Sequence, residues 1–312
     1  MLKLVYKRAL GACILIGIAS VFCFLLIAAF PGNVALVIAE QRSATVSVEV
    51  VEQIEREYGL RDPILVRYGR WMGDTVSGDL GQSLRTGEPV GPTLVRRAAP
   101  TIVLILCGGA VALTIGLLFS FVGALRPNSI IDQGVRGLAL VGASLPKFYI
   151  AALLVYLFGV HLQILPTYGF AGPSSWILPA IAIGVVPGAL ISRVTRVALE
   201  NAMNRPYVTT ALAKGMSRRH ILLRDAVPNV LPIVINAFGI HFAFMVQAAI
   251  VIEPIFAWPG VASYFVDAAR FRDFQVLQST LLVFSIFFIL VNLIVDLLVL
   301  VVDPKQRRPR SA

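Results

Sequence analysis

Charged residues are scarce in this sequence. Only 14% of its 312 residues are Asp, Glu, Lys or Arg, whereas 57% are hydrophobic and the mean hydropathy is +0.82. Soluble globular domains carry about 25% charged residues, and a soluble protein of this length could not cover so many apolar side chains with polar surface. The composition therefore excludes an ordinary soluble protein and indicates an integral membrane protein.

Cysteine is scarce as well. Cys13, Cys23 and Cys107 all lie in apolar segments and lack the spacing of a disulfide or a metal site. His161 and His241 stand alone near the expected outer ends of apolar segments, so no metal site is predicted. A Gly-x-x-x-x-Gly-Lys-[Ser/Thr] phosphate loop is missing, as are His-Glu-x-x-His and Gly-x-Ser-x-Gly motifs. We therefore expect no catalytic residue, no directly bound cofactor and no ATP site in this chain.

The positive charge that the chain does carry lies beside its apolar segments. The formal net charge is +10, and Lys3, Lys7 and Arg8 precede the first apolar segment. Seven Lys and Arg residues lie between Arg193 and Arg224, and four follow Asp303. Clusters of this kind set the orientation of membrane spans. No separate basic domain remains, so nucleic-acid binding is not predicted.

Six segments have the roughly 20 mostly apolar residues that a membrane span needs. They are Ala9–Phe30, Thr101–Leu125, Gly137–Val160, Trp176–Ser192, Val230–Ile252 and Ser279–Val302. The first is expected to be a retained helix, because its apolar core is longer than the ~7–15 residues of a signal peptide and lacks a clear cleavage site. The fourth is the weakest, because Pro179 and Pro187 interrupt it. Small residues would let these helices pack closely, namely Gly108, Gly109, Gly116 and Gly184.

An even number of spans places both termini on one side of the membrane. If that side is the cytoplasm, the inner segments carry 16 Lys and Arg residues, whereas the two short outer loops carry only Arg270 and Arg272. The long segment 31–100 exceeds the ~60 residues over which this charge rule applies. We therefore expect both termini in the cytoplasm.

The segment 31–100 is expected to form a small external helical cap. Val46–Tyr58 and Ile64–Val76 both have the apolar spacing of amphipathic helices, and a turn region rich in Gly and Asp follows at Ser77–Ser83. A loop with only a packing role is the equally weighted alternative.

The loop after the fourth span has the signals of two short helices. Asn204 is placed to cap a helix that begins at Pro206, runs over Tyr207–Lys214 and stops at Gly215. Ser217 would then cap a second helix that ends before Pro228. A basic, amphipathic pair of this kind suits docking into a groove of a partner protein. A helix lying on the membrane surface is the alternative.

The spacing in this loop resembles that of a known family. Thr209-Thr210-Ala211, then Gly215, then Asp225-Ala226-Val227-Pro228 match the EAA loop of binding-protein-dependent ABC permeases. Tyr207-Val208, Ala213-Lys214 and Asn229 are similar to the branch of that family that imports peptides and nickel.

Further segments resemble the same branch along almost the whole chain. In order they are Pro31-Gly32, Tyr58-Gly59-Leu60 with Pro63, Tyr68, Trp71, Gly78-Asp79-Leu80-Gly81 with Ser83, Pro89-Val90, Pro100-Thr101, Glu253 with Phe256 and Trp258-Pro259-Gly260, Arg272-Asp273, Asn292, Asp296 and Asp303-Pro304. The chain departs from the family pattern at several positions. They are Thr209 in place of Glu, Gln247-Ala248 in place of Gly-Gly, Asn33 in place of Asp, Ala262 in place of Gly and Gln275 in place of Pro. These departures bear on the substrate rather than on the architecture.

The resemblance implies an all-α membrane protein, a type I importer permease bundle of about six transmembrane helices with an external helical insertion between the first two. Residues 1–30 would form the cytoplasmic N-terminus and the first helix, and residues 31–100 would form the external insertion. Residues 101–302 would form a five-helix core, which includes a cytoplasmic coupling loop at 193–229. Residues 303–312 would form a cytoplasmic tail. Such a chain lies in the bacterial inner membrane and forms half of a translocation path. Its implied partners are membrane lipid, a second permease, two ATPase subunits that use ATP and Mg²⁺, and a periplasmic or lipid-anchored binding protein.

The resemblance also implies roles for individual residues. The contact with the ATPases would be made by Tyr207, Thr210, Ala211, Lys214, Gly215 and Arg218. The position of Gln247 in the middle of the fifth span, and not the resemblance, suggests that it lines the translocation path, because an unpaired polar group is costly there. An interhelical hydrogen bond is the equal alternative for Gln247. Glu253 is the second residue expected on the path. The external loop motif consists of Phe256, Trp258, Pro259 and Gly260.

The identity of the substrate stays open between two choices. Peptides are the first expectation, and nickel or another small chelate is the second. A secondary transporter or channel is a remote alternative, because it would leave the Gly215 loop unexplained and favours inverted repeats that are not visible here. Whether the permease pairs with itself or with a paralogue is open. The roles of Lys147 and Asp296 stay open as well: Lys147 is expected either to snorkel or to pair, and for Asp296 a structural pair with Asn292 is favoured over a functional role.

Overall fold

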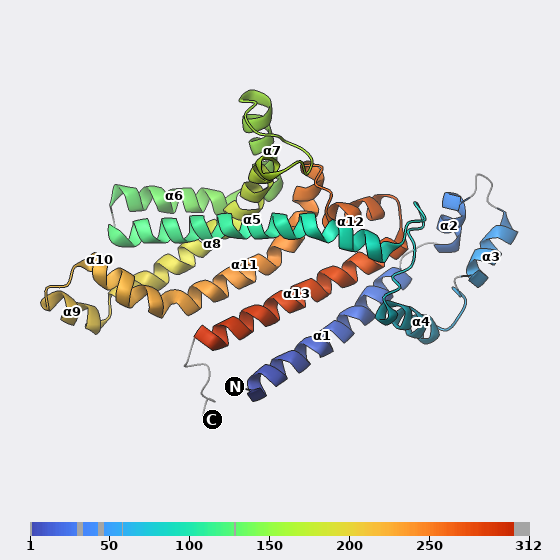
Figure 1. Ribbon diagram of the computed structural model, residues 1–312, viewed down its shortest axis with the longest axis horizontal. Coiled ribbons are helices and arrows are strands. Elements are labelled where there is room, and N and C mark those ends of the chain that lie inside the picture. Colours follow the sequence, from blue (N-terminus) through green and yellow to red (C-terminus); the bar gives the residue numbers. More distant parts are fainter. Residues whose placement is uncertain (1, 30–33, 43–46, 58, 128, 303–312) are drawn as a thin grey trace. The chain divides into compact units, whose positions relative to one another are not determined.

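The computed structural model describes residues 2–29, 34–42, 47–57, 59–127 and 129–302, and these residues are helical almost throughout (Figure 1). Their only β-type pairing is an isolated antiparallel bridge between Gln82 and Pro89. Five helices are long and apolar enough to cross a membrane, or six if one bent pair counts as a single span. The predicted all-helical membrane fold is confirmed. The Pro31-Gly32 turn, Tyr58 and the 303–312 tail lie outside the described residues.

Contacts divide the chain into two compact units. The first unit consists of Met1–Ala9, Ile102–Trp258 and Leu290–Ala312, and the second consists of Leu10–Thr101 and Pro259–Ile289. Three long helices contribute residues to both units. They are α1 (Leu2–Ala28), α5 (Val90–Leu125) and α13 (Phe274–Val302).

The helix α8 (Pro173–Met203) lies at the centre of the first unit. It packs along α11 (Val227–Ile255) on one side and against α6 (Ile130–Ser144) on another. Of the candidate spans in the described residues it is the most buried. It was expected to be the weakest span, but it continues through Pro179 and Pro187 without a break. Neighbouring helices can compensate for the backbone hydrogen bonds that proline removes, so the two prolines do not end the span.

Glycine allows α5 and α8 to approach closely. A Cβ atom added at Gly184 would lie 2.5 Å from the Gly108 carbonyl oxygen and 2.9 Å from Val111. One added at Gly116 would lie 2.7 Å from Ile191. These distances are too short for a real Cβ atom, so the predicted role of the small residues is confirmed at these three glycines.

The third span is not the single helix over Gly137–Val160 that the sequence predicted. The helix α6 ends at Ser144, and α7 (Lys147–Leu154) continues through a π-helical segment, η1 (Val155–His161), after a bend of 105°. The bend follows from Pro146, because a proline disfavours helical backbone at the preceding residue, here Leu145 with ψ 136°. Each half is about 22 Å long at 1.5 Å per residue, which is too short to cross ~30 Å of hydrocarbon alone. Lys147, whose role was left open, is half-buried at the start of the second half.

Short helices make up much of the second unit. They are α2 (Val34–Arg42), α3 (Val48–Glu57), α4 (Ile64–Ser77) and α12 (Val261–Arg270). The helices expected over Val46–Tyr58 and Ile64–Val76 correspond to α3 and α4, whereas α2 was not predicted. The α2 and α3 helices pack through Ile38 and Ile54, both almost fully buried.

Two segments that resembled the family separately meet in the second unit. The Ser83 hydroxyl donates a hydrogen bond of 2.5 Å to the buried carboxylate of Asp273. The Gln275 amide donates to the Leu80 carbonyl at 2.8 Å. Gln275, where the family pattern has a proline, thus contributes a hydrogen bond between the two segments. The helix α5 begins at Val90 rather than at Thr101, whose hydroxyl accepts a hydrogen bond from the Val261 backbone N–H at 2.9 Å.

Replacing a contact glycine should separate α5 from α8. Gly184→Ala adds a methyl group against backbone and side-chain atoms, and overpacking of this kind costs about 1–3 kcal/mol. We expect a lower melting temperature for the purified protein in detergent. Gly134→Ala on α6 is the matched control, because nothing lies within 4 Å of the added atom. If both variants melt alike, the close packing of α5 and α8 is not a source of stability.

Candidate functional site

The loop after α8 folds into two short helices joined by a tight turn. The helix α9 (Pro206–Ala213) is followed by Gly215 at φ +83°, and α10 (Arg218–Ile221) begins after Ser217. Gly215 N–H donates to the Leu212 carbonyl at 2.9 Å and Met216 N–H to the Ala211 carbonyl at 3.2 Å, the paired bonds that close a helix with a left-handed residue. Ser217 accepts a hydrogen bond from the His220 N–H at 3.3 Å. The predicted turn at Gly215 and the predicted cap at Ser217 are confirmed. We call residues 206–221 the α9–α10 hairpin.

Two boundary predictions for this loop were wrong. Asn204 does not cap α9; it ends α8, and its N–H donates to the Glu200 carbonyl at 3.1 Å. Pro206 begins α9 after Arg205, which makes no side-chain cap, because a proline needs no N–H partner in the first helical turn. The second helix does not end before Pro228 either. It continues through a π-helical segment, η2 (Leu222–Ala226), directly into α11.

One face of the hairpin packs onto the ends of α8 and α11. Val208 and Ile221 of the hairpin, and Leu222 directly after it, are buried in an apolar cluster. The same cluster contains buried residues from both long helices, namely Leu199, Ala202 and Met203 of α8 and Val230 and Val234 of α11. Ala211, predicted to seat a partner, lies half-buried against this cluster. The hairpin is therefore fixed to both helices by its own apolar face.

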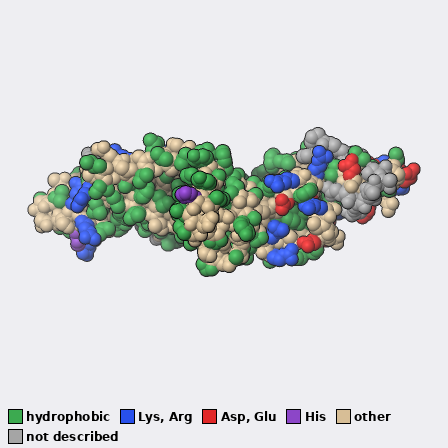
Figure 2. Space-filling model, turned by 90° about the horizontal axis from the view of Figure 1, so that it is seen from above, with side chains coloured by type: hydrophobic (Ala, Val, Ile, Leu, Met, Phe, Trp, Pro, Cys, Tyr) green, Lys and Arg blue, Asp and Glu red, His purple; other side chains and the backbone are tan. Residues whose placement is uncertain are grey.

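The opposite face of the hairpin is open. Of the residues expected to contact the ATPases, those exposed are Tyr207, Thr210, Lys214, Gly215 and Arg218. Leu212 is 45% exposed beside them. Positions 206–224 contain no Asp or Glu. On the face drawn in Figure 2, Lys and Arg side chains gather at the end of the first unit that α9 and α10 form. The result is a basic surface with exposed apolar side chains.

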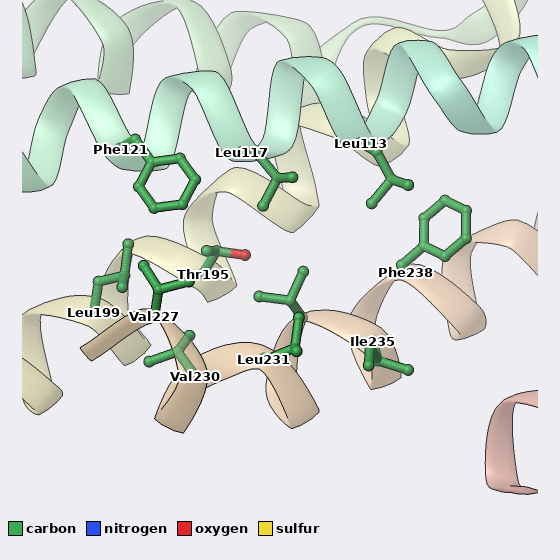
Figure 3. Close-up of a pocket in the computed structure, with 11 residues that line it drawn as sticks. Leu113, Leu117, Phe121, Thr195, Leu199, Val227, Val230, Leu231, Ile235 and Phe238 are labelled. Carbon is green, nitrogen blue, oxygen red and sulfur yellow. The ribbon is translucent and has the colours of Figure 1, made fainter. Parts of the chain in front are cut away.

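An apolar cavity of about 280 Å³ lies beside the cluster that holds the hairpin (Figure 3). It is formed by α5, α8 and α11, and Leu117, Leu199 and Phe238 line it together with further aliphatic residues. Its one polar lining residue is Thr195. Sites that recognise polar ligands need several placed polar groups, so this cavity does not suit a peptide.

A more polar groove lies on the face shared by α8 and α11. It has a volume of about 530 Å³ and is lined by Arg193, Asn201, Ile233 and His241 among others. Further along α11, Gln247 is also exposed. The helical spacing of Ile233, Phe244 and Gln247 places them within one stripe. Glu253, the second residue expected on the path, is fully buried and so is not exposed on this face.

The motif at 256–260, which the sequence places in an external loop, forms a folded turn at the end of α11. Phe256 and Trp258 are each 1% exposed, and Ala257 between them has φ +46°. Trp258 packs edge to face on Phe170 with ring centroids 4.9 Å apart, and the Phe256 carbonyl accepts from Gly169 N–H at 2.9 Å. The motif thus holds the loop before α8 against α11. Pro259, which is exposed, and Gly260, which is buried, follow it and lead into α12.

Sequence reasoning missed one group of charged residues in the first unit. Asp132 is fully buried and pairs with Arg136 and Arg196. Arg196 was counted only as part of the basic loop, and nothing in the spacing of the two residues indicates that they meet. Among the described residues, no group of three or more His, Cys, Asp and Glu is placed to hold a metal ion.

Residues 112–308 match the family model for the binding-protein-dependent transport system inner membrane component. Residues 1–105 match the model for the N-terminal part of such a membrane component. The chain belongs to the binding-protein-dependent permease family. The permease is therefore a multi-pass inner-membrane subunit of an ABC importer and lacks an ATPase domain. Members of this family work with ATPase subunits and with binding proteins.

Two relatives match the sequence of this permease along nearly its whole length. The glutathione transport system permease protein GsiC of Escherichia coli O6:H1 is 33% identical over 307 residues, which are 98% of this chain and 99% of that protein. A protein of Brucella abortus, assigned by its name to peptide transport, is 34% identical over 315 residues, with the same coverage. An inward-facing structure of the MetNI methionine ABC transporter matches with a TM-score of 0.56 and 19% identity, covering 67% of this chain and 96% of that one. The last match supports the fold.

The two faces of the hairpin should respond differently to truncation. Val208→Ala removes buried apolar atoms from the cluster, which should lower the free energy of unfolding by about 1–3 kcal/mol. Leu212→Ala, the matched exposed position on α9, should change it by less than ~0.5 kcal/mol. Thermal unfolding of both variants in detergent measures the difference. Equal destabilisation by the two would show that α9 is not anchored as the structure indicates.

Proposed function

We propose that this permease forms half of a translocation path for peptides and receives the motion of its ATPase subunits through the exposed face of the α9–α10 hairpin. The observation that carries the proposal is the two-faced hairpin. Its apolar face joins the ends of α8 and α11, and its basic face, which includes Lys214 and Arg218, is left for a partner. A subunit without an ATP site needs such a contact to be driven by hydrolysis.

The hairpin is connected to both long helices in ways suited to transmitting motion. The chain stays helical from α10 through η2 into α11, and Asn229 donates its side-chain amide to the Asp225 carbonyl at 2.8 Å beside this junction. On the other side, α9 follows α8 after two residues, Asn204 and Arg205. Because the buried cluster also ties α9 to both helices, a displacement of the hairpin moves the ends of α8 and α11 together.

The same two helices carry the groove that is proposed as part of the path. Displacing their ends changes the separation of residues on their shared face, such as Arg193 of α8 and His241 of α11. Gln247, exposed on α11, would offer an amide to the peptide groups of a substrate. This arrangement links hydrolysis to access along the path without a phosphate site in the permease.

The orientation proposed here places the hairpin and both termini in the cytoplasm. The concentration of Lys and Arg beside the inner ends of the spans supports it. The short helices of the second unit, α2, α3 and α4, would then form the external insertion. A second permease completes the path, and a binding protein delivers the substrate on the outside.

Peptides are proposed as the substrate class because of the relatives. One is named for glutathione, itself a small peptide, and another for peptides. The exposed amide of Gln247 and the polar residues of the groove suit hydrogen bonding to peptide groups. Neither of these two relatives is named for nickel, so the chelate alternative gains no support from them.

Uptake by the reconstituted importer tests the proposal. The permease, its partner permease, both ATPase subunits and the binding protein are placed in proteoliposomes with ATP inside. Labelled glutathione, labelled di- and oligopeptides and radioactive nickel are then supplied separately. We expect ATP-dependent accumulation of a peptide and none of nickel. Uptake without ATP, or of nickel alone, would contradict the proposal.

The same preparation tests the path residue. Gln247→Leu removes the amide but keeps a side chain of similar size. We expect the KM for peptide to rise about two- to tenfold, because one hydrogen bond to a peptide group is worth about 0.5–1.5 kcal/mol. Val251→Leu on the same exposed stripe is the control and should leave the KM unchanged. Equal kinetics for all three proteins would remove Gln247 from the path.

A further inference from the structure

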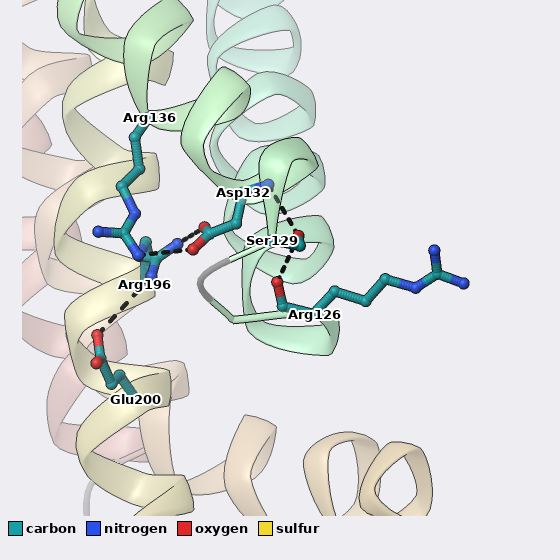
Figure 4. Close-up of polar contacts among 6 residues, drawn as sticks. All are labelled: Arg126, Ser129, Asp132, Arg136, Arg196 and Glu200. Atoms are coloured by element: carbon teal, nitrogen blue, oxygen red, sulfur yellow. Dashed lines mark hydrogen bonds and ion pairs between the residues drawn. The ribbon is translucent and has the colours of Figure 1, made fainter.

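An ion cluster around a buried carboxylate connects α6 and α8 in the first unit and lies against α5 (Figure 4). Asp132, in the first turn of α6, is 0% exposed. Its carboxylate accepts from Arg136 of the same helix at 2.6 Å and forms an ion pair with Arg196 of α8. Arg196 is itself only 13% exposed, and its guanidinium lies 4.0 Å from Glu200. We call Asp132, Arg136, Arg196 and Glu200 the Asp132 cluster.

Two residues outside the Asp132 cluster, Ser129 and Gly123, allow it to form. Ser129 caps α6 by accepting a hydrogen bond from the Asp132 N–H at 3.2 Å, which fixes the first turn of that helix. On α5, Gly123 leaves the space that the ion pair fills. A Cβ atom there would lie 2.6 Å from the Asp132 carboxylate and 2.7 Å from Arg196. The ion pair therefore sits directly against the backbone of α5, so that α5, α6 and α8 meet at one point.

Stability alone does not explain a buried carboxylate. Removing a charge from water is costly, and buried ion pairs can often be replaced by apolar residues without loss of stability. Such a pair does, however, fix geometry, because its two partners must stay together to avoid a buried unpaired charge. A cluster of this kind is therefore better explained by what it holds in position.

The cluster lies beside the anchor of the hairpin. On α8, Arg196 is followed within two turns by Leu199 and Met203, which belong to the apolar cluster that packs against α9. A displacement of the hairpin would therefore act on α8 next to Arg196, which pairs with Asp132 of α6 and lies against the backbone of α5. We propose that Asp132 is a positioning residue for ATP-driven transport, holding Arg196 so that α5, α6 and α8 move as one body when the α9–α10 hairpin is displaced. This inference rests on the proposed coupling through the hairpin.

The experiment compares hydrolysis with transport in the complete reconstituted importer. Asp132→Asn, and Asp132→Leu combined with Arg196→Met, both abolish the ion pair. The double variant removes both buried charges, and Arg136, which loses its partner, is 48% exposed and stays hydrated. We expect both to assemble with the ATPases and to hydrolyse ATP with an unchanged KM for ATP. Substrate transported per ATP hydrolysed should fall at least tenfold. A purely structural role would change assembly or melting temperature and leave this ratio at the wild-type value.

A second pair of variants covers the case in which the charge changes prevent folding. Gly123→Ala pushes on the ion pair without altering any charge, whereas Gly134→Ala on α6 adds a methyl group with nothing within 4 Å. We expect a reduced transport-to-hydrolysis ratio for Gly123→Ala and a wild-type ratio for Gly134→Ala.

The two proposals fail in different ways. If the wild-type importer shows no ATP-dependent uptake, the proposed function is wrong. If the wild type transports normally and Gly123→Ala, Asp132→Asn and the double variant all keep its ratio, only the role of Asp132 is wrong.

Discussion

The packing of Val208, Ile221 and Leu222 against α8 and α11 is the contact on which the proposed coupling depends. Each fully buried aliphatic side chain contributes about 1.5–3 kcal/mol, so together they can hold short helices that would not be stable alone. Because this face is committed to the permease itself, the face with Lys214 and Arg218 is free to meet another subunit. A hairpin that was packed less firmly could be displaced by a partner without displacing α8 and α11.

Two further features connect the long helices to the hairpin and to one another. The π-helical segment η2 keeps the chain helical across Pro228, so that α10 and α11 form one continuous element. The Asp132 cluster joins α8 to α5 and α6 beside the hairpin anchor. The helices α8 and α11 also share the groove that is lined by Arg193 and His241. Under the proposed function, the permease transmits motion, and the energy comes from its ATPase partners.

The sequence revealed the local parts of this arrangement and missed those that depend on distant contacts. Apolar segment length located the spans, and the special backbone requirements of Gly215 and Ser217 located the turn and cap, because these signals lie within a few residues. The break at Leu145-Pro146 was missed, since the apolar composition continues through it. Pro228 was read as a stop, although a π-helical segment accommodates it. The pairing of Asp132 with Arg196 has no local signal at all, because the two residues meet only after α6 and α8 have packed.

Cross-linking from α9 to the ATPase subunits tests the central claim most directly. In a permease whose three native cysteines are replaced, a photoreactive group is attached to a cysteine at Leu212, the exposed apolar position of the hairpin, or at Val76 of α4, which is 79% exposed. The account predicts that the group at Leu212 cross-links to an ATPase subunit in the assembled importer, with a yield that changes when ATP is hydrolysed, and that the group at Val76 does not. An active importer in which Leu212 never reaches an ATPase subunit would contradict it.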